Sequence, residues 1–150
     1  MIMGQHLLIE CRGQHAMLGS DDLKALMTRA AAAGGATVLV HHFHEFGGHG
    51  GITGVLVLAE SHITVHTWPE VQYAAFDIFM CGDAQPMKAA RIIVDQFPDA
   101  EVCIKVVARG YPSETGTNCT ISTPNVTPIP AVASKQMDAL SDALRTSTNN

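Results

Sequence analysis

The sequence predicts an α/β (α+β) fold, a two-layer sandwich in which a mainly antiparallel sheet carries two helices packed on one face. The expected elements follow the order β-α-β-β-β-β-α-β, and four strand-like segments in succession favour antiparallel pairing. The regular alternation of Rossmann and TIM folds is missing, as are a GxGxxG after a strand and a Walker loop. The 150 residues are 47% hydrophobic and 15% charged, which fits one folded domain and excludes overall disorder.

The first part of the chain predicts one helix between two strands. Residues 5–11 (QHLLIEC) have strand character, and so do residues 36–43 (ATVLVHHF), which are rich in β-branched side chains. Ser20 is the expected N-cap of the helix, and Gly34-Gly35 is its expected C-terminal signal. Between these signals apolar residues recur at helical spacing: Leu23, Leu26, Met27 and Ala30.

The second part predicts four more strands and a second helix. A glycine-rich segment, GGHGG at 47–51, precedes them and is expected to form a loop, because glycine permits positive φ. The strands are expected at residues 52–58, 63–67, 73–80 and 101–108, and the helix at 86–97. Pro69 ends the second of these strands, and Pro86 suits the first turn of the helix.

Composition divides the chain near residue 110. Twelve of the 18 residues from Ser113 to Pro130 are Ser, Thr, Asn or Pro, a set too polar to bury a core of its own. We therefore expect one domain at residues 1–110 and a polar, flexible C-terminal tail at 111–150 that the chemistry does not need.

Charge and hydropathy exclude several classes of function. The net charge of −5 and the pI near 5.8 argue against binding to nucleic acid or to anionic membranes. No apolar run approaches the ~20 residues of a membrane-spanning helix, and no secretory signal is expected. We therefore expect a cytoplasmic protein with reduced thiols.

The polar composition is unusual, because 8 His and 4 Cys stand beside only 9 Lys and Arg. The cysteines form no CxxC, so neither a zinc ribbon nor a thioredoxin-type site is expected. Cys11 and Cys103 lie in apolar strand-like runs and are expected to be small buried residues. His42 and His44 can share a strand face, but no third ligand follows at a standard spacing, so no metal site is predicted.

The most reactive set of side chains lies in residues 60–70, ESHITVHTWPE. Ser61 falls at an expected sharp junction of two strands, where its hydroxyl can act as a nucleophile if a base is near. Counting by twos places His62 and His66 on one strand face. Cys81 ends a neighbouring strand, so Ser, His and Cys could converge on one edge of the sheet. A polar sheet face beside a turn is the plainer interpretation of the same pattern.

The segments AESHITVHTWPE and YAAFDIFMCG closely resemble the processing and active-site region of prokaryotic S-adenosylmethionine decarboxylases. The resemblance extends to GQHLLIE, to GATVLVHHFHEF and to Arg109-Gly110, and it covers roughly residues 4–110. It implies a self-processing, pyruvoyl-dependent decarboxylase made as a proenzyme. The implied reaction converts S-adenosylmethionine to S-adenosylmethioninamine and CO2 for spermidine biosynthesis.

The resemblance also implies how the chain is processed. Ser61 Oγ attacks the Glu60 carbonyl to give an ester, and loss of the Ser61 α-proton breaks that ester by β-elimination. The residue matching His66 accepts this proton, and the one matching Thr53 assists. Cleavage between positions 60 and 61 leaves a β chain, residues 1–60, and an α chain that begins with a pyruvoyl group derived from Ser61.

In turnover the resemblance implies a Schiff base between the pyruvoyl carbonyl and the substrate amine, which accepts electrons as CO2 leaves. Cys81 matches the proton donor for the substrate α-carbon. Phe46 and His66 match residues that stack on adenine, and Glu70 matches the one that binds the ribose hydroxyls. The implied assembly is a homodimer of processed protomers, (αβ)2, with sheets packing across the interface.

Several positions depart from the family pattern and leave alternatives open. The GGHGG loop is one residue longer than expected, Met80 replaces a common Thr, and Val71-Gln72 replaces a frequent Tyr-Gly. The changes in the loop and at Val71-Gln72 lie in segments expected to line the substrate pocket. The same scaffold could therefore decarboxylate a basic amino acid, arginine or ornithine, or serve unprocessed as a non-catalytic binding protein.

Overall fold

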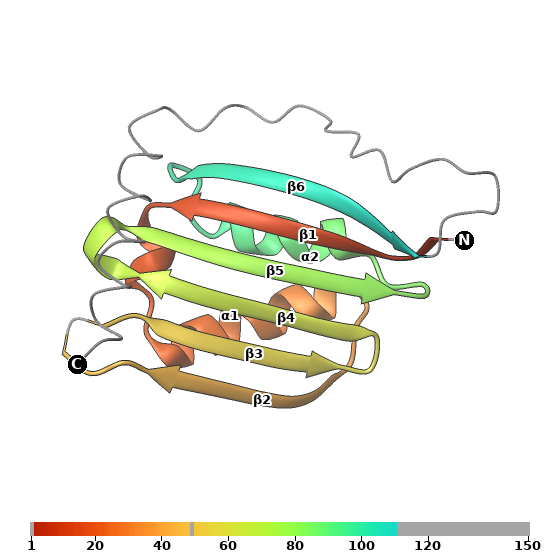
Figure 1. The fold of residues 1–150 in the computed structure, drawn as a ribbon, viewed down its shortest axis with the longest axis horizontal. Helices are drawn as coiled ribbons and strands as arrows, with labels where there is room; N and C mark the ends of the chain where they lie inside the picture. The colour runs from red at the N-terminus through yellow and green to blue at the C-terminus, as the bar shows by residue number, and fades with distance from the viewer. Residues whose placement is uncertain (1, 49, 111–150) are drawn as a thin grey trace, which may run out of the picture.

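A computed structural model describes residues 2–48 and 50–110, and in this range the chain forms one six-stranded sheet with two helices against it (Figure 1). The strands are β1 (Ile2–Arg12), β2 (Val38–Glu45), β3 (Ile52–Leu58), β4 (Ser61–Trp68), β5 (Tyr73–Cys81) and β6 (Glu101–Gly110). The helices are α1 (Ser20–Ala33) and α2 (Pro86–Asp95), with short 3-10 turns η1 (Gln14–Met17) and η2 (Pro69–Val71). The predicted element order and the α+β sandwich are confirmed.

The sheet has the strand order β2-β3-β4-β5-β1-β6, and every neighbouring pair is antiparallel. Strands β2 to β5 form a meander, so each turns back on the one before it (Figure 1). β1 pairs with β5, and β6 pairs with β1 at the outer edge. β4 and β5 are the two middle strands, so β4 lies away from the edge strands β2 and β6 along its whole length.

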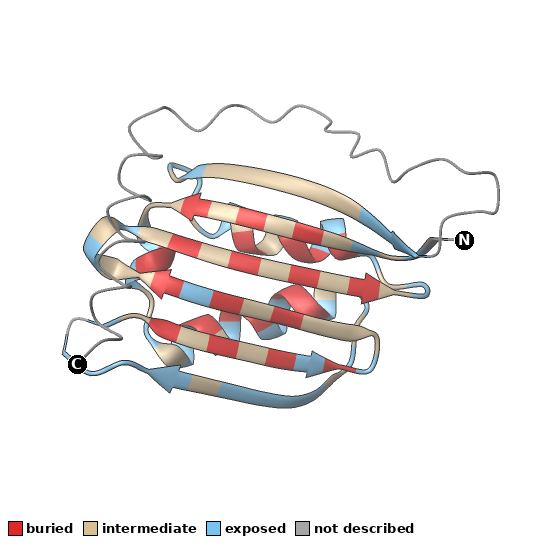
Figure 2. Ribbon diagram, viewed as in Figure 1, coloured by how far each residue is buried: buried red, intermediate tan, exposed pale blue. Residues whose placement is uncertain are grey.

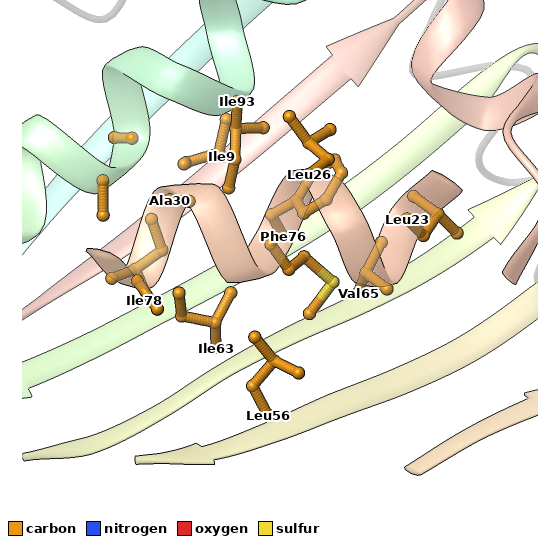
Figure 3. Close-up of a cluster of buried hydrophobic side chains, with 14 of the residues drawn as sticks. Ile9, Leu23, Leu26, Ala30, Leu56, Ile63, Val65, Phe76, Ile78 and Ile93 are labelled. Carbon is orange, nitrogen blue, oxygen red and sulfur yellow. The ribbon is translucent and has the colours of Figure 1, made fainter. Parts of the chain in front are cut away.

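Both helices cover the same face of the sheet, and the core lies between the two layers (Figures 1 and 3). Burial alternates along the inner strands such as β3 and β5, because only every second side chain points toward the helices (Figure 2). The buried residues of β5 are Ala74, Phe76, Ile78 and Met80. They share one core cluster with Leu23, Leu26 and Ala30 of α1 and Ile93 of α2. Each large apolar side chain in this cluster contributes roughly 1.5–3 kcal/mol by its burial.

The predicted N-cap of α1 is wrong by one residue. Gly19 is the N-cap, and Ser20 is the first helical residue. The Ser20 hydroxyl donates to the Glu45 carboxylate on β2 instead of capping the helix amides. The C-terminal signal is confirmed, because Gly35 has a φ of +74°, which glycine adopts without steric cost.

Other boundaries differ by a few residues from those predicted. Helix α2 ends at Asp95 rather than Phe97, because Pro98 disfavours helical backbone at the residue before it. Strand β4 begins at Ser61 rather than Ile63. No helix in the part of the chain that the structure describes is long and apolar enough to cross a membrane. The expected tail, 111–150, lies outside the described residues.

The face of the sheet opposite the helices is here named the open face. Its side chains alternate with the buried ones and are mostly half-buried. They include His6, Leu8 and Glu10 of β1, Thr53 and Val55 of β3, His62, Thr64 and His66 of β4, and Asp77, Phe79 and Cys81 of β5. The open face therefore mixes apolar, aromatic and titratable groups, and it carries most of the reactive residues that the sequence singles out.

Candidate active site

Ala59 and Glu60 form the tight turn between β3 and β4, and the Glu60–Ser61 bond lies at its exit. Ser61 pairs with Leu58 across this turn, so the predicted sharp junction is confirmed. The Ser61 φ of 148° is unusual, since few residues other than glycine adopt a positive φ. Such a backbone costs on the order of 1–3 kcal/mol, and breaking the Glu60–Ser61 bond would release that strain.

Cys81 lies directly beside this bond, at the end of β5. Its backbone N–H donates to the Glu60 carbonyl oxygen at 3.2 Å, and its thiol donates to the same oxygen at 3.1 Å. Two donors on one carbonyl oxygen polarise the carbonyl and can stabilise an oxyanion formed there. The structure therefore brings Ser61 and Cys81 together around one peptide bond.

The turn is also held from the side of the α1–β2 connection. The Thr37 backbone N–H donates to the Glu60 carboxylate at 2.9 Å, and the Ala59 N–H donates to the Thr37 carbonyl at 2.9 Å. Both bonds fix the turn to the segment that follows α1. The Glu60 carbonyl is thus held between this anchor and the end of β5.

His62 adjoins Ser61 and belongs to the open face. Its Nδ1 lies 3.4 Å from the Ser61 hydroxyl oxygen. Its ring packs edge-on against His6, with ring centroids 6.1 Å apart, and it is tilted against Phe79 at 5.9 Å. These three rings come from β4, β1 and β5, and the sheet register brings them side by side.

Charged groups lie near the neighbouring His6 and Phe79 rings. Arg109 places its guanidinium carbon 5.1 Å from the centre of the Phe79 ring. Burial lowers the pKa of His6; the Asp77 carboxylate opposes this effect, while His62 and Arg109 add to it. His6 is therefore largely neutral near pH 7 and packs against its neighbours as an aromatic ring.

A second group of predicted residues lies at the opposite end of β4. The Thr53 hydroxyl oxygen and His66 Nδ1 are 3.0 Å apart, and the His66 side chain is exposed. His66 follows Ser61 by five positions on the same strand, which corresponds to about 16 Å at roughly 3.3 Å per residue. One chain therefore does not bring His66 to Ser61, and the Ser, His and Cys that meet at the Ser61 end of the sheet are Ser61, His62 and Cys81.

Phe46 and Glu70 lie at the same end of the sheet as His66. Phe46 follows β2 and is 52% exposed, with its ring edge-on to His44 at 4.7 Å. Glu70 is exposed in η2, which follows β4 directly. The residues expected to bind a nucleoside thus accompany His66 near the C-terminal end of β4, whereas Ser61 begins β4 and Cys81 ends β5. These two ends of β4 lie at the left and at the right in Figure 1.

The remaining sequence candidates have other surroundings. Cys11 is fully buried, and burial raises the pKa of its thiol to about 12, which makes it unreactive. Cys103 is only half-buried, because it points to the open face from the edge strand β6, so the expectation of full burial is wrong. Across residues 2–48 and 50–110, no group of three His, Cys, Asp or Glu side chains could hold a metal ion.

Sequence reasoning misses three residues that shape this site: Thr37, His6 and Phe79. Thr37 acts through its backbone, so its residue type carries no signal. His6 and Phe79 reach His62 only through the register of three strands, which one sequence does not reveal. Alternation along β1 could have assigned His6 to the open face, but it could not have shown that His6 lies near the Ser61 site.

Comparison with known proteins agrees with this geometry. The family model for S-adenosylmethionine decarboxylase matches residues 5–110. The S-adenosylmethionine decarboxylase proenzyme of Thermodesulfovibrio yellowstonii is 40% identical over 111 residues, which is 72% of this chain and 82% of that protein. The proenzyme of the same name from Moorella thermoacetica is 38% identical over 111 residues, with coverage of 72% and 88%.

A solved structure is also similar. The crystal structure of the adenosylmethionine decarboxylase from Aquifex aeolicus superimposes with a TM-score of 0.67 at 32% sequence identity. The superposition covers 78% of this chain and 98% of that one. Sequence and fold thus point to the same set of proteins.

Proposed function

The chain belongs to the S-adenosylmethionine decarboxylase family, and we propose that it is a proenzyme that cleaves itself and then decarboxylates S-adenosylmethionine. The observation that carries this proposal is the Glu60 carbonyl oxygen, which accepts hydrogen bonds from the Cys81 N–H and thiol beside the strained Ser61. A turn with no chemical task needs neither the strain nor the paired donors.

Cleavage begins when Ser61 Oγ attacks the Glu60 carbonyl carbon. The carbonyl oxygen gains negative charge, which the two Cys81 donors stabilise. The C–N bond then breaks to give an ester and a free amine, and the Ser61 backbone is released from its unfavourable φ. Removal of the Ser61 α-proton expels the Glu60 carboxylate, and hydrolysis leaves a pyruvoyl group at position 61.

The pyruvoyl group supplies the electron sink that decarboxylation requires. Cys81, whose thiol already lies beside position 61, delivers a proton to the substrate α-carbon. The exposed Phe46 ring and the His66 imidazole offer stacking surfaces for adenine, and the Glu70 carboxylate accepts hydrogen bonds from the ribose hydroxyls.

The working unit in this proposal is a two-fold dimer, (αβ)2, in which each site combines residues of both chains. Ser61 and Cys81 of one protomer meet Thr53 and His66 of the other. The separation of about 16 Å between Ser61 and His66 supports this arrangement, because a base that far away cannot reach the Ser61 α-proton in its own chain.

The position of the two groups also supports a dimer. Ser61 and Cys81 lie at one end of the sheet, measured along the strands, and Thr53 and His66 lie at the other end. A two-fold axis through the centre of the open face would exchange these ends, so the same packing would complete both sites at once. It would also cover the half-buried apolar residues of that face.

Complementation between two inactive variants tests the shared site. We expect neither Ser61→Ala nor His66→Ala protein to mature alone. When the two chains are co-expressed, mixed dimers contain one site with Ser61 from one chain and His66 from the other, so about half of the His66→Ala chains are expected to be cleaved. Intact-mass spectrometry measures the products. No cleavage in the mixture, with both chains folded and associated, would contradict the shared site.

The substrate is tested by CO2 release from carboxyl-labelled S-adenosylmethionine and, in parallel, from labelled arginine and ornithine. We expect release from S-adenosylmethionine alone. Activity on arginine without activity on S-adenosylmethionine would overturn the assignment. A cytoplasmic location and a working domain of residues 1–110 remain parts of the proposal; the family match over residues 5–110 supports the domain.

A further inference from the structure

We propose that His62 is the base that activates Ser61 during self-cleavage. This inference rests on the proposed function, because it assigns a residue to the first step of the same processing reaction. His66, at the far end of β4, is expected to act only in the later elimination. The first step therefore needs a proton acceptor of its own, close to the Ser61 hydroxyl.

The hydroxyl of Ser61 has such a neighbour in its own chain. His62 Nδ1 lies 3.4 Å from Ser61 Oγ, within reach of a proton transfer that tightens as the reaction proceeds. Cys81 cannot serve as this base, because its thiol already donates to the Glu60 carbonyl oxygen at 3.1 Å. The nucleophile, the base and the oxyanion donors are thus three different residues around one peptide bond.

The sheet holds the His62 ring in this position. His62 pairs with Phe79 on β5, and Phe79 pairs with His6 on β1, so the three rings form a row across the open face. The ring centroids of His62 lie 6.1 Å from His6 and 5.9 Å from Phe79. A ring packed on two sides has little freedom to turn its Nδ1 away from Ser61.

Gly4 makes room for this row. A Cβ at this position would lie 2.9 Å from Cε2 of Phe79 and 2.6 Å from the Met80 carbonyl oxygen, so the Phe79 ring depends on the bare glycine backbone. The Arg109 guanidinium covers the same ring from β6 at 5.1 Å. Residues from two further strands, β1 and β6, therefore support the contact between His62 and Phe79.

The proposed step balances without an external reactant. His62 Nδ1 takes the proton from Ser61 Oγ as Oγ bonds to the Glu60 carbonyl carbon, whose π electrons move to the oxygen. The oxyanion then collapses, and the C–N bond breaks. The protonated His62 returns its proton to the departing Ser61 nitrogen. The products are an ester between Glu60 and Ser61, a free amine and neutral His62.

The step can be isolated by removing the later one. In a His66→Ala background the elimination is blocked, so the ester persists and hydroxylamine cleaves the chain after Glu60. The measurement is the initial rate of this cleavage at saturating hydroxylamine, followed by intact-mass spectrometry. His62→Gln is combined with His66→Ala, because the Gln amide can accept a hydrogen bond from Ser61 but cannot take its proton.

We expect His62→Gln to lower the cleavage rate about 100-fold in this background. His41→Gln in the same background is the matched control, and we expect it to leave the rate unchanged. His41 is exposed and lies on the edge strand β2, opposite Leu56 of β3. Equal rates for the two double variants would overturn the proposal.

Chemical rescue separates a base from a structural residue. In His62→Ala/His66→Ala protein, added imidazole is expected to restore the cleavage rate in proportion to its concentration. A rate that imidazole does not raise, in protein with the wild-type circular dichroism spectrum, would also overturn the role of His62. Wild-type chain run in parallel distinguishes failure of the His62 role from failure of the proposed function. If the wild-type chain never cleaves itself, the proposed function fails as well.

Discussion

The thiol of Cys81 has two successive tasks. It holds the Glu60 carbonyl oxygen before cleavage, at 3.1 Å, and it is the expected proton donor to substrate afterwards. The backbone N–H of the same residue shares only the first task. One residue therefore links the maturation of the chain to its later catalysis.

Replacing Cys81 with Ser is expected to separate these tasks. The Ser hydroxyl can still donate to the Glu60 carbonyl, so self-cleavage should stay within about tenfold of the wild-type rate. Decarboxylation should fall about 100-fold or more, because a hydroxyl is a much weaker acid than a thiol. Intact mass reports the first effect, and CO2 release from labelled S-adenosylmethionine reports the second. Wild-type decarboxylation by folded Cys81→Ser protein would refute the proton-donor role.

His15 makes the fold sensitive to acid. It is fully buried between the Phe76 and Phe97 rings, and its Nε2 donates to the Ile93 carbonyl at 2.7 Å. Nδ1 is buried without a partner in the described part of the chain, so a proton added there would have no acceptor. Burial lowers the pKa of His15 below its ordinary value of 6.5, against the opposing effect of the Ile93 hydrogen bond.

The sign of the pH effect follows from this lowered pKa. Below pH 6.5 the unfolded chain binds a proton at His15 before the folded chain does, so stability falls as the pH decreases from 6.5 through the folded pKa. We expect the Tm of wild-type protein to fall more between pH 7.5 and 5 than that of His15→Gln. His41→Gln should behave like wild type. Parallel curves for wild type and His15→Gln would show that His15 is not responsible.

Among the elements, two other segments fix the position of the β3–β4 turn and so of the Glu60–Ser61 bond. Thr37, after α1, binds the Glu60 carboxylate, and the end of β5 binds the Glu60 carbonyl. The helix layer thus helps to position a bond at the rim of the sheet. This predicts that the Glu60 side chain matters for cleavage although it takes no part in the chemistry.

Replacing Glu60 with Ala is expected to slow self-cleavage about tenfold, because the turn loses its charged acceptor for the Thr37 N–H. Glu60→Gln keeps an acceptor oxygen and should cleave at close to the wild-type rate. A time course of intact mass after expression compares the two. If Glu60→Ala matures as fast as Glu60→Gln, the anchor to Thr37 has no role in positioning the bond.

The sequence predicted the strands and helices well, because their signals are local. Strand-like runs located β2 to β5, and Gly34-Gly35 marked the end of α1. The N-cap of α1 was missed because Ser20 has a better partner, the Glu45 carboxylate, on a distant strand. The spatial split between Ser61 and His66 was also missed, although a strand that rises roughly 3.3 Å per residue requires it.

At the scale of the molecule, the open face is the surface that the proposed dimer buries. Thr64 lies at its centre, between Val55 on β3 and Asp77 on β5. An arginine at position 64 would face the Asp77 carboxylate, so a single chain should tolerate it. Two such chains face to face would place bulk and charge on the two-fold axis.

Thr64→Arg is therefore expected to convert the dimer to monomers and to lower self-cleavage about tenfold or more, with the fold retained. Light scattering gives the molar mass in solution, and mass spectrometry gives the extent of cleavage. Thr28→Arg, on the exposed surface of α1, is the control and should change neither. Full maturation of monomeric Thr64→Arg protein would show that one chain suffices.

Which chain supplies His66 could not be read from one sequence, because symmetry between copies leaves no local pattern.

Self-cleavage is measured by intact-mass spectrometry of the purified, denatured chain. We expect two fragments divided between Glu60 and Ser61. The C-terminal fragment should be lighter than a serine-terminated one by the mass of one ammonia, because a pyruvoyl group replaces the seryl residue. Ser61→Ala protein should remain one species. A wild-type chain that stays at 16.0 kDa and never yields these fragments would contradict self-cleavage at Ser61.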